Sequence, residues 1–174
     1  MKSRKTLPVL SLLLFCVLPY ALAQTKSGPA TTKDSLRVAA SPYHAEVSYI
    51  LSDLQSMPRT AITYHNIHSN ADEVYSGVRL ADIFGPLGVP LGKDLRGEAL
   101  AVCVVATGSD GYKVALAIGE IDPAFHPGDV IVADTLNGQP LAPDIGPFRL
   151  VVTEDKRPAR AVRNLVSVEL KSVK

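Results

Sequence analysis

The sequence lacks any large excess of charge of one sign. Across its 174 residues, 18 Lys and Arg stand against 17 Asp and Glu, which leaves a formal net charge of +1. Proteins that bind nucleic acid through its phosphates usually carry a clear basic excess, so nucleic acid is not expected as a partner. A hydrophobic content of 47% with so little net charge also excludes a largely disordered chain and predicts one globular domain.

The common motifs of nucleotide-binding and catalytic sites are missing as well. The sequence contains no phosphate-binding loop, dinucleotide glycine fingerprint, Gly-x-Ser-x-Gly elbow or Cys-x-x-Cys pair. Long helices are not expected either, because 13 Pro and 12 Gly interrupt the chain at short intervals. These absences favour a fold built from short elements and leave any reaction undefined by motif.

The first residues have the pattern of an export signal. Three basic residues precede an apolar run, Leu7–Leu18, which is short for a transmembrane helix and is followed by the small-x-small sequence Ala21-Leu22-Ala23. We expect cleavage after Ala23, which makes residues 1–23 a signal peptide. The protein is then periplasmic or secreted, with no membrane span after cleavage; the alternative is a retained N-terminal anchor.

The mature chain is expected to consist of a flexible polar leader, residues 24–34, and one folded domain, residues 35–174. Cys16 leaves with the signal peptide, so Cys103 is the single remaining thiol. One thiol cannot form an internal disulfide, and core burial must therefore hold the domain together. An inert side chain in a core strand is the expected role of Cys103.

Short apolar runs rich in Val, Ile and Tyr predict a strand-rich domain. Asn137-Gly138 predicts a tight hairpin turn, and Ser109-Asp110-Gly111 a second turn. Helices are expected at Leu80–Leu87, which has one apolar face, and at Pro158–Arg163. The fold class is therefore α+β, with mostly antiparallel sheets and short helices. The predicted strands are Ala45–Leu51, Thr60–Tyr64, Ala99–Ala106, Lys113–Ile118, Val130–Asp134, Phe148–Thr153 and Leu165–Leu170.

Two groups of side chains are candidates for a site. Lys156, Arg157, Arg160 and Arg163 lie within eight residues that contain no acid. On a helix, Arg160 and Arg163 would share a face, where two guanidinium groups suit a phosphate or carboxylate; a solvated face beside a sheet edge is the alternative.

Histidines form the second group. His65 and His68 are three residues apart, so on a strand they would point to opposite faces, and only a loop would bring them together on a metal. Ordinary loop histidines are the simpler interpretation, because neither histidine directly adjoins a carboxylate or thiolate in the sequence.

Five segments in order resemble the molybdopterin-binding domain of the sulfite oxidase family. The resemblance extends over most of the mature chain, from about Tyr75 to Leu170. They are Tyr75-Ser76-Gly77-Val78-Arg79-Leu80-Ala81-Asp82-Ile83, Ser109-Asp110-Gly111-Tyr112, Leu136-Asn137-Gly138-Gln139-Pro140-Leu141, Gly146-Pro147-Phe148-Arg149-Leu150-Val151-Val152 and Ala159-Arg160-Ala161-Val162-Arg163-Asn164. The resemblance implies an α+β fold of mixed and antiparallel sheets, in agreement with the strand-rich pattern.

The resemblance also implies a cofactor and an activity. Active members of the family bind a molybdenum–molybdopterin cofactor and transfer an oxygen atom to or from substrates such as sulfite or sulfoxides. In this sequence Arg160 and Arg163, with Lys156, match the basic positions that hold the pterin phosphate, and His65 stands where the bacterial branch has the cysteine that binds molybdenum. Neutral imidazole does not reproduce the donor strength of a thiolate.

Two functions follow, and the sequence leaves the choice between enzyme and binding protein open. The first is a cofactor-free or degenerate exported member that binds a small anion or a protein partner. The alternative is an active molybdenum–pterin oxidoreductase that transfers oxygen atoms and needs an external redox partner. A wide pocket near Arg160 with His65 on its wall favours the enzyme, whereas a pocket filled by Tyr64, Tyr112 or Phe125 favours the binding protein.

Overall fold

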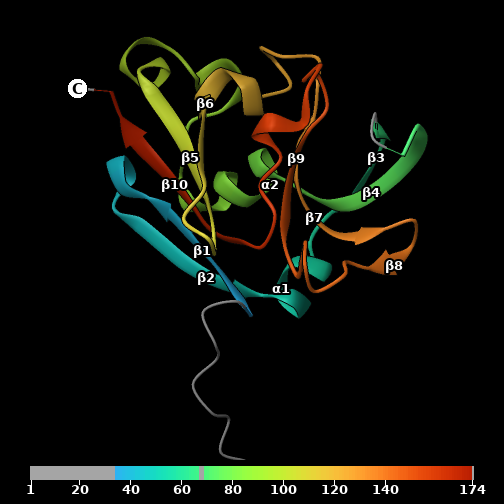
Figure 1. Cartoon of the computed structure of the whole chain (residues 1–174). Coiled ribbons are helices and arrows are strands. Elements are labelled where there is room, and N and C mark those ends of the chain that lie inside the picture. The colour runs from blue at the N-terminus through green and yellow to red at the C-terminus, as the bar shows by residue number, and fades with distance from the viewer. Residues whose placement is uncertain (1–33, 67–68, 174) are drawn as a thin grey trace, which may run out of the picture.

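The computed structural model describes residues 34–66 and 69–173, which form two β-sheets with short helices between and beside them (Figure 1). The predicted signal peptide and nearly all of the predicted leader lie outside the described residues. No helix of the described residues is long and apolar enough to cross a membrane. The α+β class and the mixed sheets expected from the sequence are confirmed.

The first sheet has the strand order β2-β1-β10-β5-β6. Its strands are β1 (Ser35–Ala40), β2 (Ala45–Ile50), β5 (Val102–Gly108), β6 (Lys113–Ala117) and β10 (Leu165–Ser172). β1 and β10 pair in parallel, whereas the other neighbours in this sheet pair antiparallel. Strands from both ends of the described chain therefore lie side by side within this sheet.

The second sheet has the order β3-β4-β7-β8, and β9 also pairs with β7. Its strands are β3 (Thr60–Asn66), β4 (Ala71–Arg79), β7 (Val130–Leu136), β8 (Gln139–Pro140) and β9 (Arg149–Val152). The predicted turn at Asn137-Gly138 joins β7 to β8, with both residues at positive φ (51° and 76°). This left-handed backbone is what Asn and Gly adopt most readily in a hairpin.

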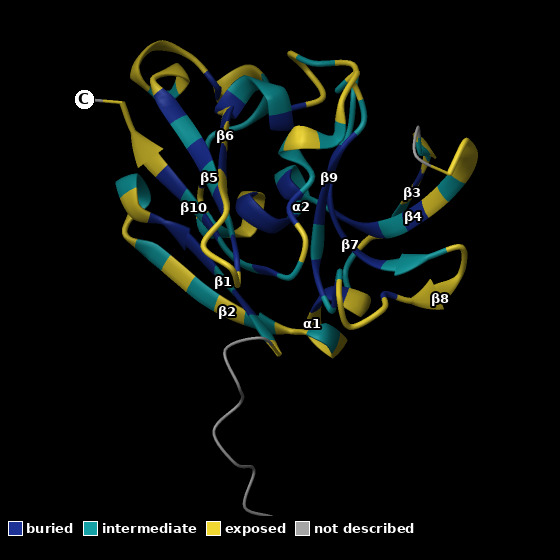
Figure 2. Cartoon of the chain, viewed as in Figure 1, coloured by how far each residue is buried: buried dark blue, intermediate teal, exposed yellow. Residues whose placement is uncertain are grey.

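The main core lies between the two sheets, where the strands are buried in Figure 2. Helix α2 (Leu80–Phe84) contributes Leu80, Ile83 and Phe84 to this core, as the apolar face of the predicted helix indicates. Helix α1 (Leu51–Gln55) contributes Leu54. β7 is buried on both faces, because Val130 and Val132 join the main core while its other side chains contact a second, smaller cluster. That smaller cluster consists of Ile62, Tyr75, Ile131, Ala133, Leu141 and Val151.

Several sequence expectations need correction. Strands β1 and β4 were not predicted, because β1 ends in two alanines and β4 begins with Ala71-Asp72-Glu73, residues that are poor in strand propensity. The predicted helix at Pro158–Arg163 is wrong: only Pro158–Arg160 form a 3-10 turn. The backbone then runs extended because the Val162 carbonyl accepts a hydrogen bond from the Leu150 amide, 2.9 Å away, which ties the segment to β9.

Candidate functional site

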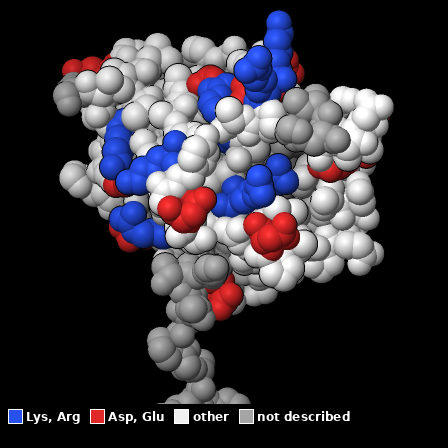
Figure 3. Space-filling model, in the orientation of Figure 1, with Lys and Arg blue, Asp and Glu red and all other residues white. Residues whose placement is uncertain are grey.

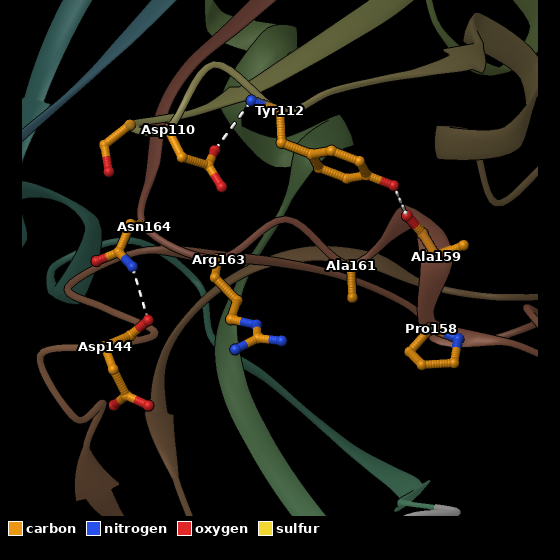
Figure 4. A pocket seen from close by; sticks show the side chains of 9 residues that line it. Asp110, Tyr112, Asp144, Pro158, Ala159, Ala161, Arg163 and Asn164 are labelled. Atoms are coloured by element: carbon orange, nitrogen blue, oxygen red, sulfur yellow. Dashed lines mark hydrogen bonds between the residues drawn. The ribbon is translucent and has the colours of Figure 1, made fainter.

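Two adjoining cavities lie on either side of the segment 158–163. Pro158, Ala161 and Arg163 line both of them. We call the first the hairpin cavity; it has a volume of about 480 Å³ and is lined by Ser109, Asp110, Tyr112, Asp144, Pro158, Ala159, Ala161, Arg163 and Asn164 (Figure 4). We call the second the tyrosine cleft; it has a volume of about 350 Å³ and is lined by Tyr64, Asn66, Glu73, Tyr75, Leu136, Ile145, Arg149, Pro158, Ala161 and Arg163.

Strand alternation builds the tyrosine cleft. Tyr64 and Asn66 are two residues apart on β3 and therefore share a face, and so do Glu73 and Tyr75 on β4. The antiparallel register places Tyr64 opposite Glu73. The rings of Tyr64 and Tyr75 meet edge to face with centroids 6.3 Å apart, and Arg149 of β9 lies over the Tyr75 ring at 4.9 Å. The second sheet thus carries the aromatic groups of the cleft and two of its charged groups, Glu73 and Arg149.

A hydrogen-bond network fixes these groups. The Tyr75 hydroxyl donates to Glu73 Oε2 at 2.8 Å and accepts from Arg149 Nη1 at 2.7 Å. Asn66 Nδ2 donates to the other carboxylate oxygen of Glu73 at 2.6 Å. Burial, together with the hydrogen bond to Glu73, raises the pKa of Tyr75 from 10.0 to about 12, although the nearby Arg149 charge opposes the shift. Tyr75 is therefore a neutral phenol across the physiological range.

Tyr75→Phe is expected to lower the free energy of unfolding by about 1–3 kcal/mol at pH 8, because Glu73 and Arg149 lose a buried hydrogen-bond partner. The loss of stability caused by the substitution should be smaller at high pH. The unfolded chain releases this phenolic proton near pH 10, whereas the folded protein holds it to about pH 12. The stabilisation is thus complete below pH 10 and is lost as the pH rises toward 12.

Urea denaturation of the wild-type protein and of Tyr75→Phe between pH 8 and pH 12 measures the difference between their free energies of unfolding. The wild-type protein should lose stability faster than the variant above pH 10, because the variant has no such proton to release. Tyr112→Phe is the matched control, since Tyr112 is 48% exposed, does not line the cleft and also loses one hydroxyl hydrogen bond, to the Ala159 carbonyl. A gap between wild type and Tyr75→Phe that stays constant with pH would contradict the raised pKa.

Arg160 does not line either cavity. Its Nε and Nη2 atoms donate to the Asp155 carboxylate at 2.9 and 2.5 Å, and its Nη1 donates to Glu120 at 2.7 Å. These hydrogen bonds raise the pKa of the Arg160 guanidinium. The expected convergence of Arg160 and Arg163 on one helix face is therefore wrong, because the helix is a single turn and two carboxylates already engage Arg160.

Arg163 is the predicted residue that the structure places at the cavities. Its side chain is exposed and points away from Asp110 and Tyr112, on the side of Asp144 and Pro158 (Figure 4). No carboxylate of the described residues forms an ion pair with it. Lys156 is exposed in the preceding loop and is not among the lining residues. Their cofactor-binding roles stay predictions.

His65 lies on the face of β3 opposite to Tyr64 and Asn66. Its side chain is 55% exposed, and its Nδ1 atom is 2.8 Å from the Asp72 carboxylate of β4. It is therefore not on the wall of either cavity, and its metal role stays a prediction. His68 lies outside the described residues. Among residues 34–66 and 69–173, no cluster of three or more His, Cys, Asp or Glu side chains is placed to hold a metal.

Two of the three aromatic side chains named from the sequence lie on the walls of the cavities and do not fill them, so they do not distinguish the two functional alternatives. Tyr64 lines the tyrosine cleft, and Tyr112 lines the hairpin cavity, where its hydroxyl donates to the Ala159 carbonyl at 2.5 Å. Phe125 is 51% exposed and lines neither. Glu73 and Arg149 were missed as site residues; the Gly-Pro-x-Arg segment that ends at Arg149 was the one available signal for the arginine.

The charges around the site are mixed in sign. On the face shown in Figure 3, the Lys and Arg side chains are interspersed with Asp and Glu side chains. The hairpin cavity combines Asp110 and Asp144 with Arg163, and the tyrosine cleft combines Glu73 with Arg149 and Arg163. The tyrosine cleft is accordingly the cavity in which guanidinium groups outnumber carboxylates.

The fold and a family match define the class of protein. The strand-rich α+β arrangement of mixed sheets with few short helices is that of the sulfite oxidase-type molybdopterin domain. Residues 27–172 match the family described as the oxidoreductase molybdopterin binding domain, and the chain belongs to this family.

One solved structure shows the same fold. The chain is similar to the crystal structure of the sulfane dehydrogenase SoxCD from Paracoccus pantotrophus, with a TM-score of 0.63 and 18% sequence identity. The match covers 84% of this chain and 40% of that one, so this chain spans less than half of the solved chain. Comparison with curated proteins gives no significant match. At this identity the structural similarity concerns the fold alone.

The side chains of the two cavities do not fit a molybdenum ion held by a cysteine. Their donors are carboxylates, phenols, amides, a hydroxyl and guanidinium groups, with no thiol or imidazole among them. Cys103 lies on β5 of the other sheet, half-buried, and does not line either cavity. A soft, anionic sulfur ligand is what gives the metal its character in such a site. These residues therefore support no reaction step through molybdenum.

Proposed function

We propose that this protein is an exported, cofactor-free member of the molybdopterin-domain family, which binds a small anion or a protein partner. The observation that carries the proposal is the composition of the tyrosine cleft. Its residues lack a thiolate donor and are instead joined through Tyr75 into a network of Glu73, Asn66 and Arg149. A site of this kind holds an anion by guanidinium groups rather than a metal by sulfur.

Export supports the same proposal. Residues 1–23 have the sequence pattern of a general secretion signal, with Lys5 where a twin-arginine signal carries its second arginine. General secretion threads an unfolded chain, and an unfolded chain cannot carry a buried cofactor across the membrane. We accordingly propose a periplasmic or secreted location.

The alternative is an active molybdenum–pterin oxidoreductase of the oxygen-transfer type, working with an external redox partner. Two observations favour it: family membership over residues 27–172, and the guanidinium of Arg163, which lies at both adjoining cavities without a carboxylate partner among the described residues. In that case Arg163 would bind the pterin phosphate. Arg160 would have to leave Asp155 and Glu120 before it could contribute.

Measuring molybdenum and pterin content separates the two. The protein is prepared twice: exported natively, and expressed without residues 1–23 in a host that makes the cofactor. We expect well-folded protein with no molybdenum and no pterin fluorescence in either preparation. A cofactor-dependent enzyme of the same family, purified from the same host, is the control for cofactor supply.

Each other outcome has a definite meaning. Near-stoichiometric molybdenum in the exported protein would overturn both the cofactor-free proposal and the proposed export of an unfolded chain. Molybdenum in the cytoplasmic preparation alone would mean that the cavities accept the cofactor and that export leaves them empty. This result would also contradict the proposal that the protein has lost its cofactor site.

A further inference from the structure

Arg149 differs from the other arginines that form hydrogen bonds or ion pairs among the described residues. Arg37 pairs with Glu46, Arg79 with Asp129, and Arg160 with Glu120 and Asp155. Arg149 has no carboxylate partner among the described residues; its Nη1 donates to the Tyr75 hydroxyl, and its buried Nε has no acceptor. A partly desolvated guanidinium without a counterion lowers the stability of the fold. An anion that enters the cleft would act as the counterion of Arg149, the role that an internal carboxylate has for these other arginines.

Beside Arg149, Arg163 is a second cation in the cleft. Arg163 reaches it from the segment 158–163, whereas Arg149 is held on β9 by its stacking over Tyr75. Glu73 lies in the same cleft and keeps its place through Asn66 and Tyr75. Two guanidinium groups against one carboxylate leave one net positive charge. This balance suits a singly charged anion and disfavours a doubly charged phosphate, which Glu73 would repel.

The rest of the lining is apolar. Leu136, Ile145, Pro158 and Ala161 form the wall beside the charged groups, with the Tyr64 ring in the same cleft. An inorganic ion would leave this wall without a partner, whereas an organic body would cover it and gain from burial. The residues that line the cleft therefore favour a ligand with an anionic head and an apolar or aromatic body.

We infer that the tyrosine cleft binds a small organic monoanion, a carboxylate or sulfonate whose head contacts Arg149 and Arg163 and whose body lies against the apolar wall. The inference rests on the proposed function, since the same cleft cannot hold a pterin at the same time. It narrows that function from a small anion in general to a class of organic acids.

Benzoate is the test ligand and benzamide its neutral isostere. We expect saturable benzoate binding by amide NMR, with shifts at Ile145 and Ala161, and at least roughly tenfold weaker binding of benzamide, because charge-assisted hydrogen bonds to the head are lost. Arg163→Gln should weaken benzoate binding roughly tenfold. Arg157→Gln is the matched control: it removes the same charge from the same loop, but Arg157 does not line the cleft.

Four results would overturn the inference: no saturable binding of benzoate, equal binding of benzoate and benzamide, equal effects of Arg163→Gln and Arg157→Gln, or tighter binding of inorganic phosphate. Molybdenum and pterin are measured on the same preparation. Protein that contains the cofactor overturns the proposed function and this inference together, whereas cofactor-free protein that fails to bind benzoate overturns this inference alone.

Discussion

Gly77→Ala is expected to lower the free energy of unfolding by at least about 3 kcal/mol. A Cβ atom at Gly77 would lie 2.0 Å from the Val132 carbonyl oxygen and 2.6 Å from the Ala133 Cα. Both are backbone atoms of β7, so neither can move without breaking the pairing of β4 with β7. The register already shifts between Ser76 and Gly77, where the two strands approach.

The matched control is Gly85→Ala. Gly85 follows α2 with helical dihedral angles (φ −52°, ψ −50°), and an added Cβ would meet nothing within 4 Å. Its effect should stay within about 1 kcal/mol, because the restriction of the unfolded chain by alanine is offset by the following Pro86, which disfavours helical dihedral angles at a residue with a Cβ. Urea denaturation of the three proteins measures both changes. Similar stability of the two variants would mean that β4 and β7 are not in such close contact at Gly77.

Arg59→Met is expected to cost about 3 kcal/mol of stability, because it leaves a buried carboxylate without its counterion. The Asp134 side chain on β7 is 1% exposed, and Arg59, which precedes β3, forms a two-pronged pair with it. The pair reaches across β4, where Arg59 is also 3.4 Å from the Ser76 hydroxyl. The hydrogen bond to Asp134 raises the pKa of Arg59, and the guanidinium is therefore charged at every accessible pH.

Arg37→Met tests whether burial is the cause. Arg37 forms an equally well aligned pair with Glu46, with distances of 2.8 and 2.7 Å, but the two side chains are 43% and 55% exposed. Removing an exposed partner should cost less than about 1 kcal/mol. The double variant Arg59→Met with Asp134→Leu should regain part of the loss, since no buried charge is then left alone. Equal losses of stability for Arg59→Met and Arg37→Met would refute the role of burial.

Local pattern was enough to predict much of the fold. Apolar runs located strands such as β5 and β10, Asn137-Gly138 located a hairpin, and the spacing of Leu80, Ile83 and Phe84 located α2. β4 could not be found this way, because its first residues are polar and its strand form depends on pairing with both β3 and β7. The conformation of the segment after Arg160 was predicted wrongly for a similar reason, because it depends on a backbone hydrogen bond to β9.

The candidate site was less predictable than the fold. Arg163, Tyr64 and Tyr112 were named from the sequence, but a run of basic residues gives no sign that Glu120, forty positions earlier, will pair with Arg160. Glu73 and Arg149 are single polar residues on separate strands, joined only through Tyr75 in the folded protein. Such networks arise from tertiary pairing, which one sequence does not display.

The parallel pairing of β1 with β10 bears on how the chain folds during its synthesis. Arg37 lies opposite Ser167, so a strand made early has its partner only after nearly all of the described chain has been synthesised. β10 also joins β1 to β5. The first sheet can therefore be completed only when β10 has been synthesised, and contacts between such distant segments form slowly. Until then the pairs β1–β2 and β5–β6 lack the strand that joins them.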